Sequence, residues 1–316
     1  ERKMTIGIGA YGPNAGRAVY DALAAAEKIG VGAIGGFVTY AAIGAGGVVL
    51  RSETQRGGAT TLFTEGETTG VAPPPAIAEA RLAALISSGP DRPGPLAQFL
   101  PADPRGGLVT GHRIPNTLGA NGKKMNEEAM ELLLAGRPAQ EAVDQVIAAS
   151  PEADCGLIAI DKDGGAYFRN TERVIRRPDV GTALRRDEAT GAVVVVIHNA
   201  IRPFPVLASA AAAVALETMV GAGAPKGAVT INAGTPIEMG SENAVHCDAA
   251  GVARRVTTTD PAIGVRGEIG AAIYLNSVVY LDGGAVGHTT FEPITSIEGG
   301  RLTELSGKDS LRISYR

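Results

Sequence analysis

The segment from residue 105 to residue 170 constrains the fold of this chain more than any other part of the sequence. An apolar strand with a polar exit is predicted at Gly107–Asn116, and an amphipathic helical region follows over Asn126–Ser150. A second apolar run, Ala153–Ile160, leads into Asp161–Gly164, whose Asp-Gly ending favours a tight reversal of the chain. This order predicts two central strands and the helices that cover them.

The helical region divides into two helices. Met130, Leu133 and Leu134 share one face of the first helix, Gly136 interrupts it, and Pro138 restarts a helix at a first-turn position. A helix pair with a tight connection is therefore expected.

Strands and helices also alternate on either side of this segment. A strand is predicted at Thr5–Ala10 and a helix at about Ala15–Ile29, with Asn14 as its capping residue and Gly30 as a left-handed end. The continuous apolar run Ala192–His198 is typical of a strand buried on both faces. The other predicted elements are a helix at Val206–Val220 and strands at Val31–Ile43, Val48–Ser52, Ala228–Asn232, Ala244–Cys247, Val252–Thr258, Ala271–Leu275 and Val278–Leu281.

Residues 65–107 are rich in proline, and these prolines surround a single helical patch predicted at Ile77–Ser88. We expect this segment to be an insertion on the surface, serving as a lid or as a contact in a homo-oligomer. The rest of the chain is expected to form one large domain over residues 1–316. Its two ends share the order strand, helix, several strands, which indicates a distant internal duplication with halves 1–185 and 186–316.

Composition and charge exclude several classes of function. Of 316 residues, 45% are hydrophobic and 20% charged, as in ordinary globular proteins. The formal net charge of -4 leaves no basic footprint for nucleic acid. No apolar run approaches the roughly 20 residues of a membrane helix. Residues 1–3 look like an addition before a natural Met4, and no signal-peptide pattern follows, so we expect a cytoplasmic protein.

The sequence predicts neither a metal site nor a cofactor. Two cysteines exclude a disulfide framework and a four-thiolate zinc site. In His246-Cys247-Asp248, neighbouring side chains on a strand point to opposite faces and do not readily chelate one ion. Gly7–Gly12 matches the Gly-x-Gly-x-x-Gly pattern of dinucleotide-binding loops, but Pro13 follows at once, and no acidic residue caps the strand that ends near Ile43.

Cys155 is the first candidate nucleophile, because it stands at the head of an apolar strand and Gly156 permits close approach to its backbone. The stretch Asp154–Gly164 resembles the strand and turn of the plant-type asparaginase and isoaspartyl peptidase family, and its Cys-Gly opening is similar to that of glutamine amidotransferases. Cys replaces the family's Thr, and the spacing to Gly164 is one residue shorter. The alternative is a small buried side chain at a strand start.

A broader resemblance covers residues 106–170. This stretch is similar to an uncharacterised bacterial family placed among the N-terminal-nucleophile hydrolases. The resemblance implies an α/β (α+β) fold, a four-layer αββα sandwich with mostly antiparallel sheets. It places Thr110-Gly111-His112 at the end of a core strand facing the active cleft. In these hydrolases a Thr, Ser or Cys begins a central strand, and its freed amine serves as the base.

The candidate site combines these residues with polar side chains that follow two strands. Cys155, or second Thr110, is the expected nucleophile, and His112 or His198 is expected to move protons. Arginine can fork onto a carboxylate, and asparagine offers both a donor and an acceptor. The expected substrate-binding residues are Arg113, Asn116, Asn199 and Arg202.

The predicted function is a hydrolase acting on an amide or related C–N bond of a small polar metabolite. Other functions remain open. One is a non-catalytic small-molecule binding or assembly protein of the same fold, and the others are an acyltransferase and a nucleotide-dependent enzyme.

Overall fold

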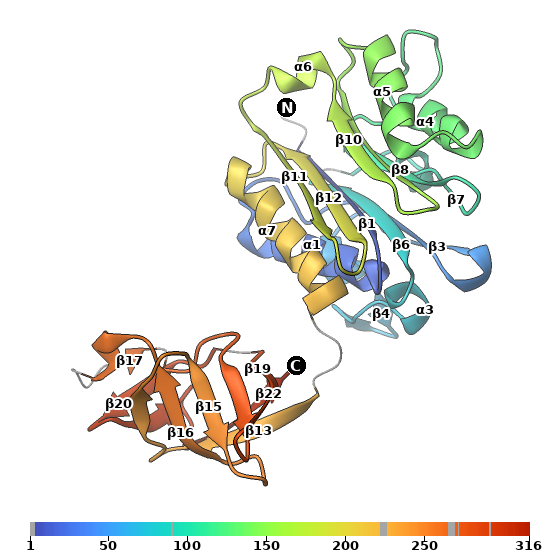
Figure 1. Ribbon diagram of the computed structural model, residues 1–316. Coiled ribbons are helices and arrows are strands. Elements are labelled where there is room, and N and C mark those ends of the chain that lie inside the picture. The colour runs from blue at the N-terminus through green and yellow to red at the C-terminus, as the bar shows by residue number, and fades with distance from the viewer. Residues whose placement is uncertain (1–3, 90, 222–225, 265–268, 271, 291) are drawn as a thin grey trace. The chain divides into compact units, whose positions relative to one another are not determined.

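A computed structural model describes residues 4–89, 91–221, 226–264, 269–270, 272–290 and 292–316. The chain folds as two compact units, residues 1–221 and 222–316 (Figure 1). This division differs from the expected single domain. It also differs from the expected halves, because a boundary at residues 185/186 would cut the strand β11 (Val180–Asp187).

Two antiparallel sheets of six and four strands form the body of unit 1, beside the small hairpin of β4 (Thr64–Glu65) and β5 (Thr68–Thr69). The strands of the larger sheet are β11, β12 (Ala192–Asn199), β1 (Thr5–Tyr11), β6 (Leu82–Ser88), β2 (Val38–Ile43) and β3 (Val49–Thr54), in that spatial order. Those of the smaller sheet are β10 (Ala166–Asn170), β9 (Cys155–Asp161), β8 (Gly107–Arg113) and β7 (Ala102–Asp103).

Helices cover the outer face of each sheet. The larger sheet carries α1 (Ala15–Ile29) and α7 (Phe204–Leu216), and the smaller sheet carries α4 (Met125–Leu134) and α5 (Ala139–Ala149) (Figure 1). The shorter elements are α2 (Gly58–Leu62), α3 (Pro75–Ala78), α6 (Glu172–Ile175), β4 (Thr64–Glu65), β5 (Thr68–Thr69), the 3-10 turns Ala45–Gly47 and Leu96–Phe99, and a π-helical turn at Glu217–Gly221.

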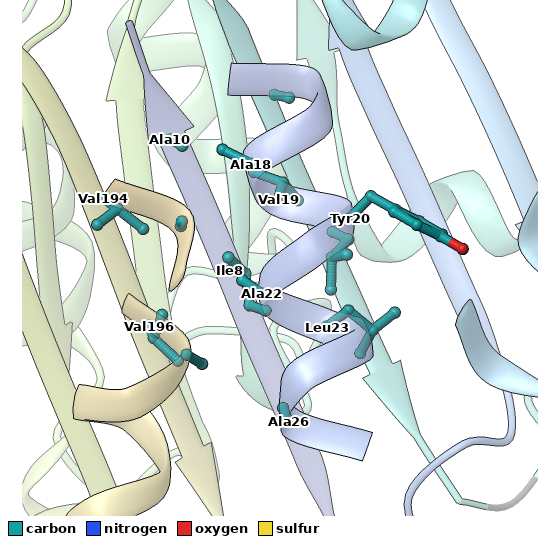
Figure 2. Close-up of a cluster of buried hydrophobic side chains, with 14 of the residues drawn as sticks. Ile8, Ala10, Ala18, Val19, Tyr20, Ala22, Leu23, Ala26, Val194 and Val196 are labelled. Atoms are coloured by element: carbon teal, nitrogen blue, oxygen red, sulfur yellow. The ribbon is translucent and has the colours of Figure 1, made fainter. Parts of the chain in front are cut away.

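Three apolar layers hold this arrangement together. Ile8 and Ala10 of β1 point toward α1, whose Val19 and Leu23 pack against them (Figure 2). Between the sheets lie side chains of the opposite strand faces, Leu108, Ile158, Ile160, Val193, Val195 and Ile197. Beneath α4 and α5 lie Val109, Leu157 and Ala159 of the smaller sheet together with Met130 and Val143 of the helices. The predicted αββα sandwich with mostly antiparallel sheets is therefore confirmed, and it resides in unit 1.

The proline-rich segment 65–107 is not a surface insertion, contrary to our prediction. It contributes β6, which lies between β1 and β2 and is buried along its whole length. Only Pro75–Ala78 of the predicted helical patch is helical. An apolar run as short as residues 82–86 fits a buried strand and a buried helix equally well, and the nearby prolines mask it further.

Other local predictions also differ from the structure. Asn14 makes no capping side-chain hydrogen bond and is itself left-handed, whereas Gly30 is extended. The predicted strand Val31–Ile43 begins only at Val38. Residue 271 of the predicted strand Ala271–Leu275 lies outside the described residues, and residues 272–275 do not form a strand.

Unit 2 is built from strands around a core of its own. Its strands are β13 (Gly227–Asn232), β14 (Ile237–Met239), β15 (Ala244–Cys247), β16 (Ala253–Thr258), β17 (Ile269–Gly270), β18 (Val278–Leu281), β19 (Gly284–His288), β20 (Thr295–Glu298), β21 (Arg301–Leu305) and β22 (Ser310–Tyr315). A 3-10 turn at Pro261–Gly264 is the one helical element among its described residues. Unit 2 therefore does not repeat the αββα order, and the expected internal duplication is not confirmed.

Candidate functional site

Four buried polar side chains lie between the two sheets of unit 1, at one end of the strands. Thr5 begins β1 and is paired with Asn199, the last residue of β12. His112 lies near the end of β8 and is paired with Gly156 of β9. Gly156 is in turn paired with Asn170, the last residue of β10. All four are at least 92% buried, so we call Thr5, His112, Asn170 and Asn199 the inter-sheet polar cluster.

Hydrogen bonds connect the members of this cluster in a chain. The Thr5 hydroxyl donates to Asn199 Oδ1 over 2.8 Å, and it accepts the backbone N–H of Arg113 over 2.5 Å. His112 Nε2 lies 2.8 Å from Asn170 Oδ1. Asn199 is also a hydrogen-bonding partner of His112. The hydroxyl at the head of the central strand is thus fixed in direction by a backbone donor and a buried amide.

Arg113 aims its backbone N–H at Thr5 because its conformation is fixed by an ion pair. It has a left-handed backbone, with φ of 64°, which is uncommon for a residue with a side chain. Its guanidinium holds Asp154 with two hydrogen bonds of 2.8 and 2.5 Å. Burial opposes ionisation of Asp154, but Arg113 outweighs it and keeps the pKa of this carboxyl below its ordinary value. The bidentate pair therefore anchors the turn that positions the donor.

His112 is uncharged at neutral pH. Complete burial lowers its pKa to about 4, although hydrogen bonding with Asn170 and Asn199 acts in the opposite direction. In the neutral imidazole, Nε2 donates to Asn170 Oδ1, whereas the buried Nδ1 has no hydrogen-bond partner among the described residues.

Cys155 does not join the cluster. Neighbouring strand residues point to opposite faces, and Cys155 faces α4 and α5 within the apolar layer beneath those helices. Its side chain is fully buried, and burial, reinforced by the Asp154 carboxylate, raises the pKa of the thiol. A nucleophilic cysteine needs thiolate character and access to substrate, and the structure gives Cys155 neither.

Thr110 lies between the sheets, but its hydroxyl is occupied. It donates to the backbone carbonyl of Leu85 over 3.0 Å, and the residue is 1% exposed. This bond ties β8 to β6 across the sandwich, which is a structural role.

His198 and Arg202 lie apart from the inter-sheet polar cluster. His198 follows Ile197 on β12 and therefore points to the helix side, where its Nε2 lies 3.1 Å from the carbonyl of Phe204 at the start of α7. Burial lowers its pKa to about 4. Arg202 lines an open depression of about 440 Å³ together with Arg177, Asp179 and Phe204.

Asn116 lies in the loop after Arg113, where its side chain donates to Gln98 Oε1 over 2.9 Å. Its own carbonyl oxygen is buried and has no hydrogen-bond partner among the described residues. Of the predicted residues, the structure thus brings His112, Arg113 and Asn199 together around one hydroxyl.

Thr5 is the functional candidate that the sequence analysis missed. A signal for it was present, because Thr5 follows Met4 directly and begins the first predicted strand. Thr5 and Cys155 both begin an interior strand, but Thr5 faces the other sheet, whereas Cys155 faces the helices α4 and α5.

Metal ligands do not gather in the described part of the chain. No group of three or more His, Cys, Asp or Glu side chains there is placed to hold a metal ion. Similarly, none of the helices in the described ranges has the length and apolar character needed to span a membrane.

Comparison with known proteins agrees with the division into two units. No curated protein and no solved structure matches this chain. Two family models do: a domain of unknown function, DUF7259, over residues 234–310, and another domain of unknown function, DUF6963, over residues 5–228. Because the second model spans most of the chain, the protein belongs to the DUF6963 family.

Proposed function

We propose that this protein is a hydrolase of the N-terminal-nucleophile type, which cleaves an amide or related C–N bond of a small polar metabolite with the hydroxyl of Thr5. The observation that carries the proposal is the placement of this hydroxyl. It lies at the head of a central strand, between the two sheets, on a backbone N–H donor and a buried asparagine. Thr5 replaces Cys155 and Thr110 as nucleophile, because Cys155 is sealed in the apolar layer beneath the helices and Thr110 lies in the middle of β8 and does not begin a strand.

The surrounding groups suit acyl transfer. Attack forms a bond between Thr5 Oγ1 and the carbonyl carbon, the C–N bond breaks, and the hydroxyl proton leaves with the amine product. Water then hydrolyses the ester and restores the hydroxyl. The Arg113 N–H stabilises the negative charge that develops on Thr5 Oγ1 as its proton leaves. Neutral His112 holds Asn170 in place.

The base in this mechanism is the α-amine of Thr5, freed by removal of the residues before it. While Met4 is attached, the Thr5 nitrogen is part of a peptide bond and cannot act as a base, and the Thr5 side chain is almost completely buried. Met4 is held in place, since its sulfur accepts the backbone N–H of Ala33 over 2.7 Å. Removal of Met4 would therefore supply the base.

The test is a chain that begins at Thr5, treated with a small β-lactone, which esterifies nucleophilic hydroxyls. We expect one probe mass on the peptide that starts with Thr5, and none when residues 1–4 are present. Thr5→Ser should keep the adduct, and Thr5→Ala should lower its rate by roughly a thousandfold or more. Thr110→Val and Cys155→Ala are the matched controls and should label normally. Equal labelling of the Thr5→Ala variant would refute the proposal.

The burial of Thr5 also supports the alternative of a non-catalytic binding protein, because a buried hydroxyl does not reach a substrate. This alternative predicts that a chain beginning at Thr5 takes up no probe at all, although it still binds small polar ligands. An acyltransferase would form the same adduct and pass the acyl group to an added amine faster than to water.

A further inference from the structure

Arg92 is a cation that is fixed in place and has no counterion among the described residues. Its backbone is clamped by the Gln55 side chain, which accepts from Arg92 N over 3.0 Å and donates to Arg92 O over 2.7 Å. Its guanidinium lies over the ring of Phe37, 5.9 Å from the ring centroid, which is within the range of a cation–π contact.

The carboxylate next to Arg92 in the chain is engaged elsewhere, because Asp91 is held by Arg56 over 2.9 Å. Within the described ranges Arg92 makes no ion pair, and its Nη2 is buried without a hydrogen-bond partner. Burial lowers the pKa of Arg92, and the positive charge of Arg113 lowers it further. Burying Nη2 without a hydrogen-bond acceptor is unfavourable, and an anion bound there would remove this cost.

Strand register places Phe37, the ring beneath the Arg92 guanidinium, two strands away from the proposed nucleophile. Thr5 is paired with Ser88, and the backbone N–H of Ser88 donates to the carbonyl of Phe37. Thr5 and Phe37 both precede residues that face the helices, Ile6 and Val38, so both side chains lie on the inter-sheet side. Two strand spacings separate them, roughly 10 Å, which is the span of a small molecule.

Asn116 supplies a second unsatisfied group in the same region. Gln98 donates to the carbonyl of Pro93, the residue after Arg92, and accepts from Asn116 Nδ2. Gln98 thus links the Asn116 amide to the residue that follows Arg92. The buried Oδ1 of Asn116 has no donor among the described residues.

We infer that Arg92 receives a free carboxylate of the substrate and that Asn116 accepts an N–H from the same molecule. The substrate class is an amide that carries a carboxylate, such as an N-acylated amino acid, with its acyl carbon at Thr5. This inference rests on the proposed function for the identity of the reacting bond, but the binding of the carboxylate does not depend on catalysis.

Binding is therefore measured by calorimetry on residues 5–316 carrying Thr5→Ala, because this variant cannot hydrolyse the ligand. The probes are a panel of N-acetyl amino acids, each paired with its neutral carboxamide. We expect at least one acid to bind about tenfold or more tightly than its carboxamide. Arg92→Gln should abolish this preference, and Arg92→Lys should keep part of it, since a lysine retains the charge but not the fork.

Arg81→Gln is the matched control. Arg81 lies just before β6, whereas Arg92 lies shortly after it. Like Arg92, Arg81 lies over an aromatic ring, with its Cζ 5.4 Å from the centroid of Tyr11. It should leave the acid preference unchanged. Equal binding of acid and carboxamide across the panel, or a preference that survives Arg92→Gln, would overturn the inference.

The two proposals fail separately. If the β-lactone does not label Thr5 but the acids still bind through Arg92, the proposed hydrolase is wrong and the carboxylate site stands. If Thr5 is labelled and no acid preference exists, the nucleophile stands and the substrate class is wrong.

Discussion

Cys155 lies in the apolar layer between β9 and the helices α4 and α5, where nothing polar activates its thiol. We expect a thiol reagent to modify it only when the protein unfolds. In a Cys247→Ala background, which leaves Cys155 as the one thiol, the labelling rate in native buffer should follow the rate or population of global opening. Full labelling should be immediate in denaturant. Native labelling as fast as that of a free cysteine would show that the layer is open.

Glu27 and the buried histidines respond to pH in opposite directions. Burial raises the pKa of Glu27 to about 7 from its ordinary 4.5, and a hydrogen bond from the Ala59 N–H only partly offsets this. A raised pKa means that the folded chain binds this proton more tightly than the unfolded chain. The stability from it is complete below pH 4.5 and is lost as pH rises toward 7. For His112 and His198, with pKa values of about 4, stability is lost as pH falls from 6.5 toward 4.

Glu27→Gln isolates the carboxyl contribution, because the histidines are common to both proteins. We expect the unfolding free energy of this variant, from urea titrations, to rise relative to that of the parent chain between pH 4.5 and pH 7. A difference that stays constant over this range would mean that Glu27 titrates normally in the folded protein.

The sequence predicted which polar residues lie in the candidate site better than it predicted which face of the sheet their side chains occupy. The sequence analysis found His112, Arg113 and Asn199, because polar residues directly after buried strands stand out. It also placed His198 with them, although alternation along β12 puts His198 and Asn199 on opposite faces. Which face is the inter-sheet face depends on the second sheet, and Thr5 drew no notice because its partners, Asn199 and Arg113, are 194 and 108 positions away.

Elements with their own periodicity could be predicted, whereas those defined by their neighbours could not. The helix pair α4 and α5 carries an apolar stripe and a glycine break, and the β9–β10 hairpin carries an Asp-Gly turn. In contrast, β6 has seven residues, of which only the first five are apolar, and it lies among prolines, so that only its pairing with β1 and β2 makes it a strand. Its central position could not be inferred without knowing the sheet order.

Two glycines of β1 test how closely the sheets approach. A Cβ on Gly7 would lie 2.3 Å from the backbone oxygen of Gly111, which cannot move without shifting β8. A Cβ on Gly9 would meet the end of the Ile160 side chain at 2.8 Å, and that side chain can rotate. We expect Gly7→Ala to cost about 3 kcal/mol or more and Gly9→Ala about 1 kcal/mol. Chemical denaturation of both variants measures the difference, and equal losses would contradict the close backbone approach.

For the whole molecule, the fold class followed from the sequence but the domain boundary did not. The resemblance over residues 106–170 pointed to the αββα sandwich that unit 1 adopts. The boundary was misplaced because the second half begins with a strand and a helix, β12 and α7, which suggested a new repeat. In the structure these two elements complete the larger sheet and its helical cover, and the chain then enters a separate β unit.

Truncation at residue 221 and at residue 185 tests which of the two boundaries separates independently folding units. A fragment of residues 4–221 keeps every strand of the sandwich, and we expect it to unfold cooperatively. A fragment of residues 4–185 loses β12, whose Val193, Val194, Val195, Val196 and Ile197 are fully buried. At roughly 1.5–3 kcal/mol for each buried side chain, this loss matches the whole stability of a typical domain, about 5–15 kcal/mol. The shorter fragment should therefore lack a cooperative thermal transition and bind a hydrophobic dye. Cooperative unfolding of residues 4–185 would mean that β1 does not need β12 beside it, and the inter-sheet polar cluster would then have no fixed place for Asn199.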